Sequence, residues 1–218
     1  MKTGVRMWSR VVQLAVIAVA VGSLGLFTLA LDLPADGLTQ SQVKAKVLSL
    51  SNMPTGWSVD NSQSNGTSNL GGCLTKLQSL GKPAKGISRA VVHYVDQTEP
   101  TFDETLESGK GAVARYDKYL HILKDCKTIS FTSGTTPISG TVGAMSFPTV
   151  GDSSSAFALT VGADGVDVTA DFVLFRVGQI DGDIGYEDYS PDAATVQAFA
   201  TEAIDKIEGK AATPPTTT

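Results

Sequence analysis

The first apolar feature of the chain is an uncharged run at residues 11–31, and three basic residues lie among the ten positions before it. A helix of 21 residues is about 31 Å long, which matches the hydrocarbon thickness of a bilayer. Basic residues before such a segment keep that end in the cytoplasm. The pattern predicts a cytoplasmic basic segment at 1–10 and a transmembrane anchor at 11–31. Everything that follows is then expected to lie outside.

A cleaved signal peptide is the alternative interpretation of the same segment, with a cut after Ala30. Signal peptides have an apolar core of 7–15 residues. The apolar run from Leu14 to Leu31 is longer than that, so we favour an uncleaved anchor. We expect a single-pass protein of the cell membrane with its C-terminal domain outside. Cleavage would instead secrete that domain.

Beyond a linker at 32–38, helical periodicity recurs in four segments of residues 39–209. The first begins at Thr39, which forms a capping box with Gln42. The last begins at Ser190, the expected N-cap, and closes at Gly209. A third, after Ser108 as N-cap, places Tyr116 on its core face and Arg115 elsewhere. The helical segments are 39–53, 73–80, 109–126 and 190–209, and a Thr/Pro tail at 210–218 is expected to be disordered.

Extended, β-branched patterns fill the stretches between the helices. In the longest strand one face is apolar from Val166 to Leu174, and the other changes from polar to apolar. Such strands suit a sheet covered by helices on one side. We therefore predict one α+β domain, an antiparallel sheet with helices packed on one face, over residues 39–209. The predicted strands are 87–95, 101–106, 128–132, 141–147, 156–161 and 166–177. The acidic residues 179–189 are expected to form a last strand or a loop, and residues 60–72 are expected to form a loop.

The charge balance excludes some partners. The chain has 17 basic and 22 acidic residues. Without the three basic residues of segment 1–10, 14 basic face 22 acidic groups, a net charge near −8. An acidic domain without a basic stripe repels phosphate backbones, so we expect no nucleic-acid partner. Membrane contact is expected through the N-terminal segment alone.

The two cysteines, Cys73 and Cys126, both lie in the part expected outside the cytoplasm. An even number of cysteines in an oxidising compartment favours a disulfide. A reactive thiol pair usually shows C-x-x-C spacing, which is absent here. We predict a structural Cys73–Cys126 bridge.

Catalytic signatures are weak. No G-x-S-x-G motif occurs, and His93 and His121 are the two histidines that could serve as a general base. A secreted or tethered hydrolase using one of them is the alternative to a binding role. Each histidine is better explained as a surface or packed side chain, so we predict a protein that is not an enzyme and has no cofactor.

The strongest chemical candidate is an acidic cluster near the last strand. Its carboxylates suit Ca²⁺, which prefers oxygen ligands. Against this, an EF-hand loop needs glycine at its sixth position, where Tyr186 stands. The competing interpretation is an acidic, solvated hairpin. The candidate calcium ligands are Asp181, Asp183, Glu187, Asp188 and Asp192.

Several marks together resemble a family. They are Met53-Pro54-Thr55-Gly56-Trp57 after an opening helix, a cysteine in a short helix near Gly72, and a helix ending in Tyr119-Leu120-His121-Ile122-Leu123-Lys124-Asp125-Cys126. Strand pairs finishing at 173–177 and a closing helix to Ile207 complete the layout. It resembles exported sensor-like domains of actinobacteria, especially mycobacteria. These occur in cell-envelope lipoproteins, in single-pass membrane proteins and as the extracellular domain of a receptor serine/threonine kinase.

The resemblance implies a ligand-binding or sensing module without catalytic activity, with a cleft between sheet and helices. The expected ligand is an unidentified small molecule or cell-envelope component. The kinase domain usually has a second disulfide and a Trp close before the helical cysteine, and this chain lacks both. A structural envelope or adhesion protein is a further alternative, and its own side chains would fill the cleft.

Overall fold

The computed structural model describes residues 37–61, 68–97, 100–133, 135–163 and 166–210. The predicted segments 1–10 and 11–31, nearly all of the linker and most of the C-terminal tail lie outside these ranges. Within the described residues, no helix is both long and apolar enough to cross a membrane.

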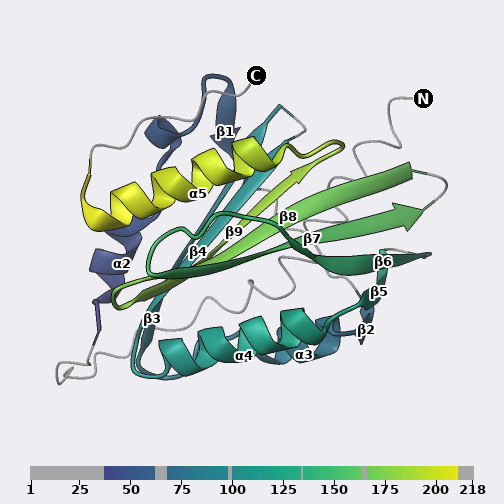
Figure 1. Ribbon diagram of the computed structural model, residues 1–218, viewed down its shortest axis with the longest axis horizontal. Helices are drawn as coiled ribbons and strands as arrows, with labels where there is room; N and C mark the ends of the chain where they lie inside the picture. Colours follow the sequence, from purple (N-terminus) through teal and green to yellow (C-terminus); the bar gives the residue numbers. More distant parts are fainter. Residues whose placement is uncertain (1–36, 62–67, 98–99, 134, 164–165, 211–218) are drawn as a thin grey trace.

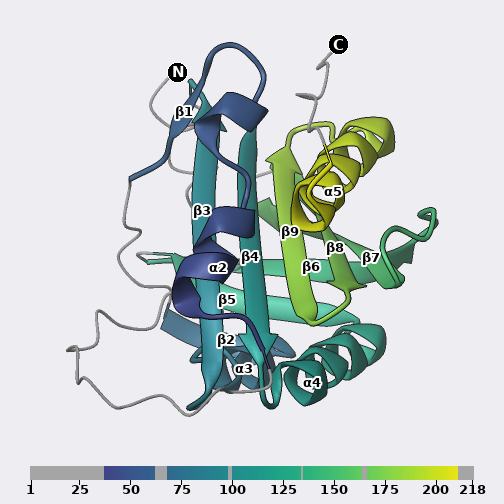
Figure 2. The same cartoon turned by 90° about the vertical axis from the view of Figure 1, so that its left-hand side faces the viewer.

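Nine strands form one antiparallel sheet in the order β1-β3-β4-β9-β8-β7-β6-β5-β2. The sheet is strongly twisted: in Figure 2, β3 and β4 stand upright, whereas β5 and β6 run across the view. Right-handed strand twist accumulates over so many strands. The strands are β1 (Trp57–Val59), β2 (Ser68–Gly72), β3 (Ile87–Asp96), β4 (Thr101–Gly109), β5 (Thr128–Ser133), β6 (Thr136–Met145), β7 (Ser153–Ala163), β8 (Val166–Val177) and β9 (Ile180–Asp188).

Helices cover both faces of the sheet (Figure 1). On one face lie α2 (Gln40–Lys46), a short 3₁₀ turn η1 (Leu50–Asn52) and α5 (Ala193–Glu208). On the other lie α3 (Leu74–Ser79) and α4 (Ala112–Asp125). The α+β class, the antiparallel sheet and the disulfide are confirmed.

The expectation that helices pack on one face is corrected by two separate hydrophobic cores. On β8, Val173 and Phe175 belong to the core under α5, whereas Phe172 and Leu174 face α3 and α4. Adjacent strand residues point to opposite faces. A strand that is apolar on both faces therefore needs cover on both.

The core under α5 centres on Phe199. Its ring centroid lies 4.7 Å from that of Phe102, 5.6 Å from Trp57 and 5.7 Å from Tyr186. These distances are typical of favourable aromatic pairs. Trp57 is buried here.

Some of the predicted helix ends are present in the structure, and others are not. The Thr39–Gln42 capping box is present, and Gly209 ends α5 in the left-handed conformation at φ 79°. Ser108, expected to cap α4, instead lies in β4, where its hydroxyl accepts from the Leu38 amide and donates to the Gln179 carbonyl. Gly111 is the N-cap of α4.

Two further expectations are corrected. Asp192, not Ser190, caps α5, because its carboxylate accepts a hydrogen bond from the Ala194 amide at 3.2 Å. Residues 68–72, expected within a loop, form the edge strand β2, which pairs with β5. Glycine and asparagine lower strand propensity, and pairing with a neighbouring strand overrides that local preference.

Candidate functional site

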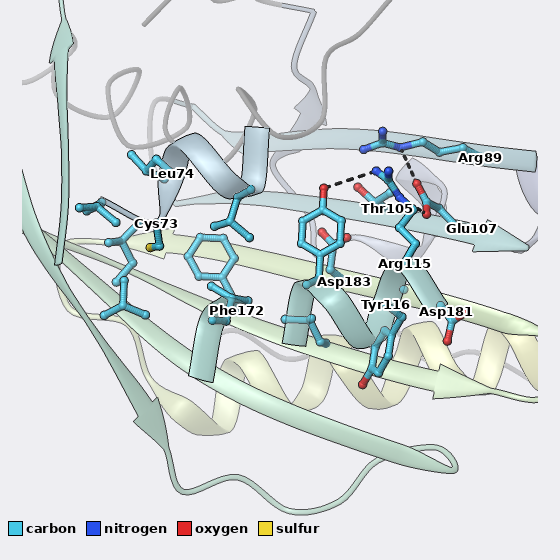
Figure 3. A pocket seen from close by; sticks show the side chains of 18 residues that line it. Cys73, Leu74, Arg89, Thr105, Glu107, Arg115, Tyr116, Phe172, Asp181 and Asp183 are labelled. Atoms are coloured by element: carbon cyan, nitrogen blue, oxygen red, sulfur yellow. Dashed lines mark hydrogen bonds and ion pairs between the residues drawn. The ribbon is translucent and has the colours of Figure 1, made fainter. Parts of the chain in front are cut away.

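A pocket of about 110 Å³, open to solvent, lies between the sheet and helices α3 and α4. Figure 3 shows charged side chains at one end, including Arg89, Glu107 and Arg115, and Cys73, Leu74 and Phe172 at the other. The lining residues are Cys73, Leu74, Leu77, Arg89, Thr105, Glu107, Arg115, Tyr116, Tyr119, Leu123, Ile129, Val142, Leu159, Phe172, Leu174, Asp181, Gly182 and Asp183.

Strand register builds the charged end. Arg89 on β3 pairs with Glu107 on β4, Glu107 with Asp181 on β9, and Asp181 with Arg176 on β8. The four side chains therefore form one row across four strands on the α4 face. Directly opposed like charges destabilise a sheet, so the adjacent Glu107 and Asp181 need the arginines that flank them.

Glu107 is held between Arg115, which is buried, and Arg89, which is half-buried. The Arg115 Nε donates to Glu107 Oε2 at 2.7 Å, and Arg89 Nε lies 3.5 Å from Oε1. Each guanidinium also donates to a backbone carbonyl, Arg115 to Lys82 at 2.9 Å and Arg89 to Gly81 at 2.6 Å. Burial raises the pKa of Glu107, although both arginines oppose that shift. This cluster fixes the wall of the pocket.

Asp181 is neutralised from the other side. Arg176 Nε donates to Asp181 Oδ1 at 2.6 Å, and its guanidinium lies 4.6 Å from the centroid of the Tyr116 ring. Asp117 on α4 lies 3.5 Å from the same guanidinium. Arg176 therefore ties α4 to the sheet at the edge of the pocket.

Asp183 occupies the next position of β9 on the same face. Its register neighbours are Thr105 on β4 and Leu174 on β8. Burial raises the pKa of Asp183 to about 7, because protein surrounds the carboxylate on all sides except the pocket. Figure 3 shows it between the charged and apolar ends.

The apolar end lies against the disulfide. Cys73 precedes α3 and Cys126 follows α4, and their Cα atoms are 5.6 Å apart. The bridge therefore joins the two helices that form one wall. Leu74 and Leu77 of α3 pack into the same hydrophobic core as Phe172 and Leu174 of the sheet.

The acidic candidates are spread along β9 rather than gathered in a loop. Alternation places Asp181, Asp183 and Glu187 on the α4 face, whereas Asp192 caps α5. The described residues contain no group of three or more His, Cys, Asp or Glu side chains arranged to hold a metal ion. Calcium binding stays a sequence-based prediction.

Gly182, between two of these carboxylates, serves packing. A Cβ atom there would lie 2.5 Å from Phe175 Cζ and 2.7 Å from Leu106 Cδ2. The Asp-Gly-Asp pattern therefore reflects the close approach of β9 to the core under α5.

The two histidines lie in different environments. His93 hydrogen bonds to Asp103 across β3 and β4. Burial lowers the pKa of His93, but the carboxylates of Asp103 and Asp60 oppose this, and the net shift of the pKa is upward. His121 is exposed and lies 3.6 Å from Asp125, one turn along α4. In the part of the chain that the structure describes, no serine or threonine hydroxyl hydrogen bonds to either histidine.

Sequence reasoning missed the arginines of the site. Arg115, expected to point away from the core, is buried because Glu107 neutralises it. One signal could have found it: Ala112, Arg115, Tyr116 and Tyr119 recur at helical spacing on one face. A second signal lies in β4, where the polar residues Asp103, Thr105 and Glu107 occupy every second position. The positions between them face the core under α5.

This antiparallel α+β fold has a known counterpart among extracellular domains. The structure is similar to the extracellular domain of PknH from Mycobacterium tuberculosis, with a TM-score of 0.61 and 13% sequence identity. The likeness covers 81% of this chain and 100% of that domain. At this identity the likeness establishes a shared fold. No protein family and no curated protein matches the chain by sequence.

Proposed function

We propose that this chain is an extracytoplasmic sensor-like domain, held at the cell membrane by residues 11–31, that binds a small molecule in the pocket beneath α4. The observation that carries the proposal is the pocket itself, in which an apolar lining adjoins a few fixed charged groups. Small-molecule sites are typically concave and mostly apolar, with a few placed polar groups. The basic residues before 11–31 support an outside location.

The proposed role is binding rather than catalysis. His93 is engaged by Asp103, and His121 is an exposed partner of Asp125. Neither histidine lines the pocket. The alternative of a structural envelope or adhesion protein expects a cleft filled by its own side chains, and the open pocket favours a binding role over it.

Native mass spectrometry of the full-length chain, purified from its own membrane, tests the proposal. Leu123→Trp would fill the pocket from α4, whereas Val113→Trp on the same helix is the matched control, because Val113 is 48% exposed and lies outside the pocket. We expect a retained ligand mass in the wild type and in Val113→Trp, and its loss in Leu123→Trp. Equal retention in all three chains would contradict binding in this pocket.

A further inference from the structure

The carboxylate of Asp183 is the unpaired charge of the pocket. Among the described residues, no hydrogen-bond donor or cationic group forms a direct hydrogen bond or ion pair with it. Asp183 is half-buried, and it lines the open pocket. An unpaired charge that is partly removed from water is unfavourable unless another group neutralises it.

The nearby cations are already engaged. Arg115 and Arg89 contact Glu107 and backbone carbonyls, and Arg176 binds Asp181. Turning either pocket arginine toward Asp183 would leave Glu107 without one of its two arginine partners. The charge that complements Asp183 is therefore expected to come from the ligand.

Apolar surface begins immediately beside this carboxylate. Leu174 is its neighbour on β8, and Phe172 follows two residues away on the same face. The pocket of about 110 Å³ is smaller than the roughly 150 Å³ closed cavity that can hold benzene, so a ring would occupy all of it and protrude through its open side. A ligand with one ring or a short branched alkyl group would fill it and extend into the open mouth.

Resting on the proposed function, we infer that the ligand is a small amphipathic cation, a protonated amine attached to an apolar group, whose ammonium binds Asp183. Thr105, the neighbour of Asp183 on β4, adds a hydroxyl that can accept a second hydrogen bond from the ammonium. Leu174 and Phe172 contact the apolar group. The arginines paired with Glu107 set the charged wall and do not bind an anionic ligand.

Three probes of similar size test this charge preference: 2-phenylethylammonium, 2-phenylethanol and 3-phenylpropionate. Their binding to the full-length chain in a nonionic detergent is measured by calorimetry, with Leu123→Trp as the variant that identifies binding in the pocket. We expect the ammonium to bind most tightly. Charge-assisted hydrogen bonds in a buried site are strong, so Asp183→Asn should weaken its binding about ten- to hundredfold. The binding of 2-phenylethanol should change less than about threefold, the rough spread of context effects.

Asp171→Asn is the matched control. Asp171 is a buried carboxylate on β8, and burial raises its pKa to about 6. It faces the opposite side of the sheet and does not line the pocket. This variant should leave ammonium binding unchanged. The thermal unfolding midpoint of Asp183→Asn should equal or exceed that of the wild type, since the substitution removes an unpaired charge without changing shape.

Each result separates the inference from the function on which it rests. Tighter binding of 3-phenylpropionate, or unchanged ammonium binding in Asp183→Asn, would overturn the cationic ligand and leave a ligand-binding pocket in place. If Leu123→Trp affects none of the three probes, the inference fails. A ligand retained from the native membrane would still support the proposed function.

Discussion

Replacing Glu104 by glutamine is expected to stabilise the protein at neutral pH and to remove much of its pH dependence. Glu104 lies in β4 on the α5 face and is fully buried. The Leu48 amide donates to its Oε2 at 2.6 Å, and Oε1 has no hydrogen-bond partner among the described residues. Lys206 is nearby, but its ammonium binds Ser49 and Asn52. A carboxylate at this position is poorly compensated.

The magnitude follows from the pKa of Glu104, which burial raises from 4.5 to about 8. The folded state therefore favours the protonated form. Its stabilising contribution is complete below about pH 4.5 and is lost as the pH rises toward 8. A shift of this size corresponds to roughly 5 kcal/mol above pH 8, and to about 3 kcal/mol at pH 7. Glutamine keeps the acceptor for the Leu48 amide and does not ionise.

The assay is denaturant unfolding of wild type and Glu104→Gln, both from residue 37 onward, at several values between pH 4 and 8.5. Subtracting one free energy of unfolding from the other cancels the contribution of distant titrating groups. The advantage of the variant should be near zero at pH 4 and grow to about 3 kcal/mol at pH 7. A difference that stays constant across this range would refute the reasoning, because Glu104 would then ionise as it does in the unfolded chain.

Three further tests of the architecture use denaturant unfolding. Replacing Cys73 and Cys126 by serine should lower the free energy of unfolding by about 4 kcal/mol, because the bridge closes a loop of 53 residues. An unchanged unfolding midpoint would contradict this. Phe199→Ala should cost about 3–5 kcal/mol, since Phe199 is fully buried at the centre of the aromatic cluster; a loss below about 1 kcal/mol would show that the core refills the space. Arg115→Met should cost about 3 kcal/mol by leaving Glu107 under-neutralised, and the added Glu107→Gln should recover part of that loss; additive losses would argue against direct coupling.

Local patterns determined a large part of the architecture. The Thr39 capping box, the closing Gly209 and the alternation of the long strand 166–177 depend on residues a few positions apart, so they could be predicted from the sequence. The cysteine pairing also followed, because two cysteines allow one connectivity. Ser108 and Ser190 carry equally good local N-cap signals, yet neither caps a helix. Ser108 lies in β4, and Asp192 caps α5 in place of Ser190.

Only the tertiary structure brings the residues of the candidate site together. Arg89, Glu107 and Asp181 are far apart in the sequence, and the register of β3, β4 and β9 alone places them in one row. Whether Arg115 faces solvent or the sheet depends on a carboxylate that another element supplies. Charges attract or repel through space, and burial is a property of the packed molecule. The sequence pattern could therefore identify the acidic residues of β9. It could not show that the fold leaves Asp183 without a partner.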